Sequence, residues 1–180
     1  MIVTERLLLR PFTAEDLPAF VAYRRDPEVA RYQSWDETFS LADAEAFLAA
    51  QQAVELGQQG AWVQLAAADR SSGEVCGDCA ARVEGAMAEL GVTFAPAFQG
   101  RGLALEALTA VIDRLFSEHA VHRVFAETDD RNTGVHRLFE RLGFRCEARL
   151  VEADWFKGEW TTLRVYAVLE REWAADRGRG

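Results

Sequence analysis

Residues 89–107 read ELGVTFAPAFQGRGLALEA, and this stretch decides how the chain is organised. A strand-like apolar run leads into a segment with three small residues, Gly100, Gly102 and Ala104, and a regularly spaced apolar helix follows. The first N–H groups of a helix lack partners within the helix and carry the positive end of its dipole. Small residues let an anion approach those groups, so the turn predicts a phosphate or pyrophosphate site, to which Arg101 would add charge. A tight turn without a ligand is the alternative.

Elsewhere the hydrophobic period alternates between helical and strand-like values. Ser40 with Asp43 resembles a capping box, and the helix that it begins is expected to end near Gly57. The predicted strands are 2–10, 61–68, 74–83, 87–94, 122–128, 144–154 and 161–170, and the predicted helices begin at Thr13 or Asp16, at 41, at 103 and at 133. This order predicts an α/β sheet with helices on both faces, and parallel strands on either side of the third helix.

The bulk composition limits the class of protein. With 180 residues, 49% of them hydrophobic and 27% charged, the chain is expected to form a single domain over residues 1–180. The net charge of −9 argues against a nucleic-acid partner and suits a cationic amine, although many proteins are acidic for solubility alone. No apolar run is long enough to span a membrane, and the start lacks the pattern of a signal peptide, so we expect a cytoplasmic protein without a membrane partner.

The three cysteines are an odd number and do not make a disulfide framework, which also fits a reducing compartment. Cys76 and Cys79 have CxxC spacing, but a structural zinc site needs a second pair of ligands that Cys146 alone cannot supply. In a strand, Cys76 and Cys79 would also face opposite sides of the sheet. We therefore expect neither a metal site nor a redox site.

The glycine-containing turn is not a P-loop, because no GK[ST] follows, and GxGxxG is also absent. It resembles the acyl-CoA-binding motif Q/R-x-x-G-x-G/A of the GNAT N-acetyltransferase superfamily, which Gln99, Gly102 and Ala104 match. TERLLLRPFTAEDLPAF (4–20) is similar to the opening of the branch that contains ribosomal-protein alanine N-acetyltransferases. ETDDRNTGVHRLFERLGF (127–144) resembles the second motif of that branch, an asparagine followed eleven residues later by GF.

The resemblance covers nearly the whole chain and implies the GNAT fold, an α/β architecture with helices on both faces. Its mixed, mostly antiparallel sheet contains a central parallel pair that splays apart, here 87–94 and 122–128. It implies acetyl-CoA as co-substrate, with no metal, and leaves room for a homodimer. The residues expected to contact acetyl-CoA are Val92, Phe94, Gln99, Gly100, Arg101, Gly102, Leu103, Ala104, Asn132 and Phe139.

Within that set, the resemblance gives individual roles to four residues. The backbone of Val92 and Phe94 would bond the pantetheine arm, and an N–H there would polarise the thioester carbonyl. Asn132 would bond the same arm or cap a helix over 133–142, and the two roles are compatible. Phe139 would pack near the thioester sulfur.

Acetyl transfer needs a neutral amine, and amines with a pKa of about 8 to 10.4 arrive mostly protonated at neutral pH. The resemblance implies Asp154 as the base, and Trp155 beside it would raise the pKa of that carboxyl by desolvation. Glu127 and Asp129 are the rival candidates, and an ordinary solvated turn is the alternative for Asp154. Both usual acids of the family are missing, because Phe139 and Val135 occupy their positions. A thiol with a pKa of about 8.5 still leaves tolerably without an acid.

The tryptophans suggest where an acceptor binds. Trp62 is expected in the core, whereas Trp35, Trp155 and Trp160 fall in loop-like segments. Trp35 and Trp155 would line an acidic cleft for a protonated primary amine, or would merely cover apolar edges. The reaction expected is direct acetyl transfer to a protein N-terminus or a small cationic amine such as an aminoglycoside or polyamine. A CoA-binding module without turnover and an enzyme using a longer donor such as succinyl-CoA are the alternatives.

Overall fold

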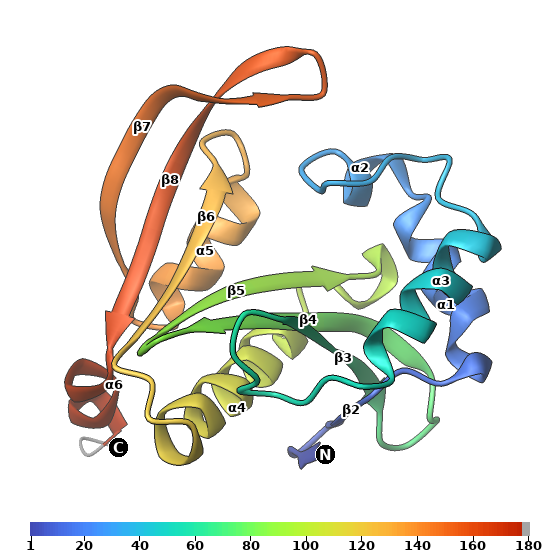
Figure 1. Cartoon of the computed structure of the whole chain (residues 1–180), viewed down its shortest axis with the longest axis horizontal. Coiled ribbons are helices and arrows are strands. Elements are labelled where there is room, and N and C mark those ends of the chain that lie inside the picture. Colours follow the sequence, from blue (N-terminus) through green and yellow to red (C-terminus); the bar gives the residue numbers. More distant parts are fainter. Residues whose placement is uncertain (178–180) are drawn as a thin grey trace.

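Eight strands form one sheet in the computed structural model, which describes residues 1–177 (Figure 1). The strand order is β1-β2-β3-β4-β5-β6-β8-β7, and every neighbouring pair is antiparallel except β5–β6. Helix α4 connects these two strands, and such a crossover makes them parallel, as predicted. The strands are β1 Ile2–Val3, β2 Leu7–Arg10, β3 Trp62–Asp69, β4 Val75–Glu84, β5 Met87–Phe94, β6 Arg123–Asp129, β7 Arg145–Phe156 and β8 Glu159–Leu169.

The helices begin where the sequence offers a cap or a glycine. The Ser40–Asp43 capping box is present at the start of α3, and Gly102, with φ +78°, precedes α4. Asn132 caps α5 through its side chain. The helical segments are η1 Ala14–Asp16, α1 Leu17–Arg24, α2 Pro27–Ala30, α3 Leu41–Gln51, η2 Pro96–Phe98, α4 Leu103–Glu118, α5 Thr133–Arg141 and α6 Glu170–Arg177. Within residues 1–177, no helix combines the length and the apolar character needed to cross a bilayer.

Two apolar clusters lie on opposite faces of the sheet. Ala67 of β3 packs in a cluster with α4 and α5, whereas its neighbours Ala66 and Ala68 pack with α1 and α3. Because successive strand residues point to opposite faces, α4 and α5 cover one face and α1 and α3 cover the other. The α1 cluster is rich in aromatic rings, with Phe20 in contact with Phe12 and Phe47.

Four predicted boundaries are wrong for local reasons. The strand expected over 2–10 is a tight hairpin, because the N–H of Thr4 donates to the carbonyl of Leu7 and the hydroxyl of Thr4 accepts from the N–H of Leu7. Helix α3 ends at Gln51 rather than near Gly57. The segment expected as a loop around 155–160 is a two-residue hairpin turn, since Lys157 and Gly158 both have positive φ. Helix α6 replaces the end of the strand expected to reach residue 170.

Three side chains also lie elsewhere than expected. Trp62 is the first residue of β3 and is 38% exposed, so it is not a core residue. His136, whose place in the helix predicted from 133 suggests an exposed side chain, is buried. Cys76 and Cys79 share the α4 face of the sheet, because a bulge in β4 makes Cys76 an extra residue. Both are buried free thiols, and burial raises the pKa of Cys76 to about 11.

Candidate active site

The central feature of the site is the early separation of β5 and β6. The two strands pair from Met87 with Arg123 to Glu89 with Phe125, and no further pair joins them in the described chain. Beyond that point β5 continues to Phe94 and β6 to Asp129 while they diverge (Figure 1). The splayed parallel pair expected from the sequence is present. We call the region in which β5 and β6 run apart the splay.

The backbone of β5 is oriented so that it can serve this space. The N–H of Ala95 donates to Cys76 of β4 at 2.9 Å, and the carbonyl of Thr93 also lies against β4, beside Gly77. Peptide groups alternate along a strand, so those of Val92 and Phe94 face away from β4, toward the splay. The side-chain amide of Gln99 donates to the carbonyl of Phe94 at 2.8 Å, so this carbonyl already has a partner. The N–H groups of Val92 and Phe94 are the donors that this part of β5 can offer to a ligand.

The turn that follows β5 opens helix α4. Gly100 and Gly102 adopt φ values of +70° and +78°, a region that favours glycine. Gly102 has no side chain to cap the helix, and the first amides of α4 have no intrahelical acceptor. This geometry fits an anionic group such as a pyrophosphate. Leu103 is buried in the core, so it can contribute only its backbone, whereas Arg101 is exposed.

A clamp from the N-terminal hairpin holds this turn. Arg6 donates to the carboxylate of Glu106 at 2.6 Å and to the carbonyl of Arg101 at 2.9 Å. Thr4 donates to the same carboxylate at 2.6 Å. Burial disfavours ionisation of Glu106, but the bonds from Thr4 and Arg6 outweigh it and lower the pKa of Glu106. The sequence analysis does not predict this clamp, although a glutamate in the first turn of a helix expected to bind an anion is a signal for one.

The model of the acetyltransferase (GNAT) domain family matches residues 6–145, a range that contains Arg6 and Glu106 of the clamp, the turn and both splayed strands. The chain belongs to this family. It is therefore an acyltransferase, and the fold and branch predicted from the sequence are confirmed.

Three proteins similar to this GNAT chain are informative. It is 28% identical to the uncharacterized N-acetyltransferase p20 of Bacillus licheniformis, over 96% of this chain and 98% of that protein. It is 31% identical to the [ribosomal protein uS5]-alanine N-acetyltransferase of Escherichia coli, over 49% of this chain and 45% of that protein. The structure of spermidine N-acetyltransferase from Vibrio cholerae, in complex with CoA and spermine, matches with a TM-score of 0.80 at 19% identity, covering 94% of this chain and 98% of that one.

Asn132 and Phe139, both expected at the acetyl-CoA site of this GNAT domain, belong to helix α5. The Asn132 side chain accepts a hydrogen bond from the N–H of Val135 at 3.3 Å, so it serves as the helix cap. Phe139 is 1% exposed and packs against Phe144 and Tyr166. Contacts of Asn132 and Phe139 with acetyl-CoA stay predictions.

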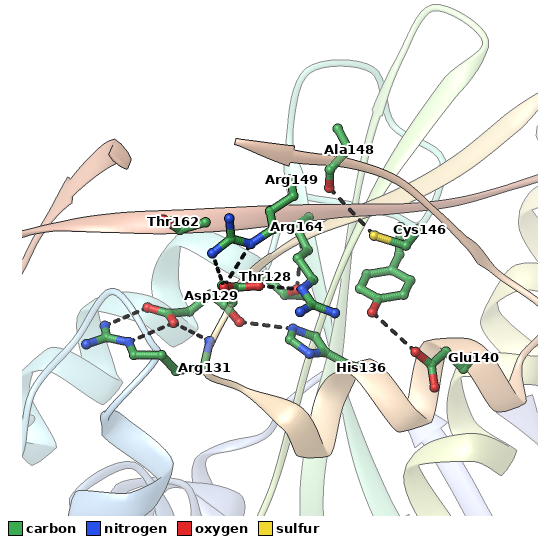
Figure 2. A network of polar contacts seen from close by, with 12 residues as sticks. Thr128, Asp129, Arg131, His136, Glu140, Cys146, Ala148, Arg149, Thr162 and Arg164 are labelled. Atoms are coloured by element: carbon green, nitrogen blue, oxygen red, sulfur yellow. Dashed lines mark hydrogen bonds and ion pairs between the residues drawn. The ribbon is translucent and has the colours of Figure 1, made fainter. Parts of the chain in front are cut away.

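The loop between β6 and α5 is held by a dense polar network (Figure 2). Arg131 binds both carboxylate oxygens of Asp129, and Asp129 therefore has a lowered pKa. Buried His136 lies 3.0 Å from the Asp129 carbonyl through its Nε2. Hydrogen bonds from Arg149, and to a lesser extent from Arg164, lower the pKa of the neighbouring Asp130 to about 2. Asp129 thus holds the loop rather than offering a free base.

The structure separates the two remaining carboxylate candidates. Glu127 is exposed on β6 and pairs with Val165 of β8, whereas Asp154 pairs with Thr161 of β8. Four residues of strand span about 13 Å, so the two carboxylates occupy different ends of the splay. Glu127 lies two residues beyond Phe125, the last β6 residue paired with β5, and Asp154 lies past the end of β6. Trp155 points to the opposite face of β7 from Asp154, so the expected desolvation by its indole is wrong.

The two tryptophans expected at the acceptor differ in their surroundings. Trp35 packs against the α1 cluster, and the Arg24 guanidinium lies 3.7 Å from its ring centroid. That guanidinium occupies one of the two faces of the indole. Trp155 is 60% exposed and forms an edge-on pair with Trp160 across the β7–β8 hairpin.

A buried polar cluster that the sequence did not reveal lies behind Thr93. Asp78 pairs with Thr93 across β4 and β5, and it accepts hydrogen bonds from Tyr23 and Gln64. Burial raises the pKa of Asp78. The cluster links α1, β3 and β4 directly to the strand that faces the splay. In residues 1–177, no group of three or more His, Cys, Asp or Glu side chains is arranged to hold a metal.

Proposed function

We propose that the chain is an acetyl-CoA-dependent N-acetyltransferase that acts on a primary amine and that residues 1–180 form one catalytic domain. The observation that carries this proposal is the junction of two features on one segment. The N–H groups of Val92 and Phe94 face the splay. The first amides of α4, which have no acceptor within the helix, follow directly after the connecting segment 95–102. An acyl-CoA can use both features, since its pyrophosphate binds the amides at a helix N-terminus and its thioester carbonyl accepts a hydrogen bond from a strand N–H. The V. cholerae relative with bound CoA supports this choice of donor.

In the proposed reaction, the neutral amine attacks the thioester carbonyl carbon, a C–N bond forms, and the C–S bond breaks. Negative charge develops on the carbonyl oxygen, and an N–H of Val92 or Phe94 stabilises it. CoA leaves as its thiolate, because Val135 and Phe139 offer no proton. A thiol pKa of about 8.5 makes this departure feasible near neutral pH.

Glu127 is the better-placed base for removing the amine proton. It lies on β6 where the strands begin to separate, two residues beyond the last pair, Glu89 with Phe125. Its side chain is exposed, so the proton can pass directly or through one water. Asp154, the base implied by the family resemblance, lies at the open end of the splay instead.

The acceptor is a primary amine, either a protein N-terminus or a small cationic amine. The uS5-alanine relative supports the first and the spermidine relative supports the second. The test is thiol release from acetyl-CoA in the presence of N-terminal peptides, aminoglycosides, polyamines and amino acids, with each product confirmed by mass. Release that depends on one amine class supports the proposal and identifies the acceptor. No release, with acetyl-CoA still bound, contradicts it and favours succinyl-CoA or a binding-only module.

The clamp on the turn gives a first prediction. Arg6→Ala should weaken CoA binding about tenfold, because loss of a half-exposed ion pair and of the bond to Arg101 frees the turn. Titration calorimetry with CoA measures the change. Arg114→Ala is the matched control, since it removes an ion pair with Glu118 at the far end of the same helix. Equal affinities for the Arg6 variant and the wild type would contradict a role for the clamp.

A further inference from the structure

The tip of the β7–β8 hairpin reaches across the splay to the segment after α1 (Figure 1). Its contact is made by Lys157, whose ammonium group donates to the carbonyls of Ala30 and Trp35, both at 2.6 Å. Ala30 ends α2, so one of these carbonyls belongs to a helix C-terminus, where a cation is favoured. The two arms of the molecule that diverge at β5 and β6 are therefore joined again at their far ends.

Further contacts complete the bridge. Arg131, in the loop after β6, binds Glu159 of the hairpin at 2.7 Å, and the hydroxyl of Tyr32 lies 3.5 Å from the Arg131 carbonyl. The hairpin tip is thus tied to the end of β6 on one side and to the α2 segment on the other. Together these bonds connect the hairpin, the loop after β6 and the α2 segment around the open end of the splay.

The choice of residue at the tip points to a specific role. Lys157 and Gly158 have φ values of +48° and +86°, the pattern of a type I′ turn. Asn or Asp suits the first position of such a turn, whereas lysine is disfavoured in the left-handed region. Lys157 is also the single lysine of the sequence. A compact ammonium with three donors can bind two converging carbonyls at once.

From these contacts we propose that Lys157 is a latch that sets the width of the acceptor opening. By holding the hairpin against Ala30 and Trp35, it limits the width of the acceptor that can enter. This inference rests on the proposed function, because it assumes that the acceptor enters the splay. It concerns positioning: Lys157 holds the opening and takes no part in proton transfer.

Two variants separate the latch from the turn. Lys157→Asn removes the ammonium and supplies a residue that suits the turn, whereas Lys157→Met keeps the chain length without the charge. Hydrogen exchange should become about tenfold faster in residues 28–36 and 154–160 of both variants, because local opening no longer breaks two charge-assisted bonds. Arg31→Met removes an exposed cation beside the same segment and should change neither region.

The specificity readout compares 1-aminobutane with its branched isomer 2-aminobutane, two amines of similar basicity. The kcat/KM ratio of branched to unbranched amine should rise about tenfold in both Lys157 variants, with the KM for acetyl-CoA unchanged. Unchanged exchange in Lys157→Asn overturns the latch whatever the activity, and so does a change confined to Lys157→Met. Faster exchange with an unchanged ratio overturns the role in specificity. Faster exchange in a protein that acetylates no amine keeps the tie but contradicts the proposed function.

Discussion

Gly77→Ala should destabilise the fold by about 3 kcal/mol or more. A Cβ at this position of β4 would lie 2.2 Å from the Thr93 carbonyl oxygen and 2.7 Å from the Phe94 Cα. Both are backbone atoms of β5, which is hydrogen-bonded to β4 along this edge, so neither can move as a flexible side chain would. Thermal and chemical denaturation measure the effect, which corresponds to a fall in Tm of about 6–12 °C for a chain of this size.

The control is Gly91→Ala on the adjacent strand. A Cβ there meets only the Ala80 side chain, at 3.5 Å, so stability should stay within about 1 kcal/mol of the wild type. A second consequence distinguishes this clash from a general loss of packing. Because Thr93 and Phe94 must shift, the surviving folded fraction of Gly77→Ala should bind CoA more weakly. A Gly77→Ala protein as stable as Gly91→Ala would show that β5 yields easily, and the orientation inferred for Val92 would lose its support.

The sequence predicted best those features that depend on local signals. The capping box at Ser40, the helix cap at Asn132 and the glycine turn at 100–102 each follow from residues close together in the chain. The parallel strand pair followed from the order of elements, since one helix between two strands imposes it. The glycine turn and Asn132, with the opening segment 4–20, carry the resemblance to the family that the domain match confirms.

What the sequence did not reveal depends on contacts between distant segments. Arg6 meets Glu106 across a separation of 100 residues, and Lys157 meets Ala30 across 127. No period or spacing encodes such a pair. The position of Asp78 was equally hidden, because a charged residue within a strand is ordinarily a solvent-facing one. The bulge at Cys76 reverses the face that an unbroken strand predicts for this residue.

Glu127→Gln should lower kcat about 100-fold to 1000-fold with little change in the KM for acetyl-CoA. Glutamine keeps the size and hydrogen-bonding reach of the side chain but cannot accept a proton from the amine, and a positioned base contributes a factor of this order. Steady-state rates with the amine identified by the acceptor panel measure the change. Circular dichroism and CoA titration establish that the variant folds and binds, as expected for an exposed residue on β6.

The pH dependence and one matched variant decide whether Glu127 acts as the base. Without a base, only amine that arrives already neutral can react, so the rate of Glu127→Gln should rise about tenfold per pH unit up to the amine pKa. Asp154→Asn makes the same chemical change about 13 Å farther along the β8 register, and its rate should stay within about threefold of the wild type. The opposite pattern, with Asp154→Asn slow and Glu127→Gln active, would assign the proton to Asp154. The amine would then be deprotonated at the hairpin end of the splay, close to the Lys157 latch, before it reaches the thioester beside Val92.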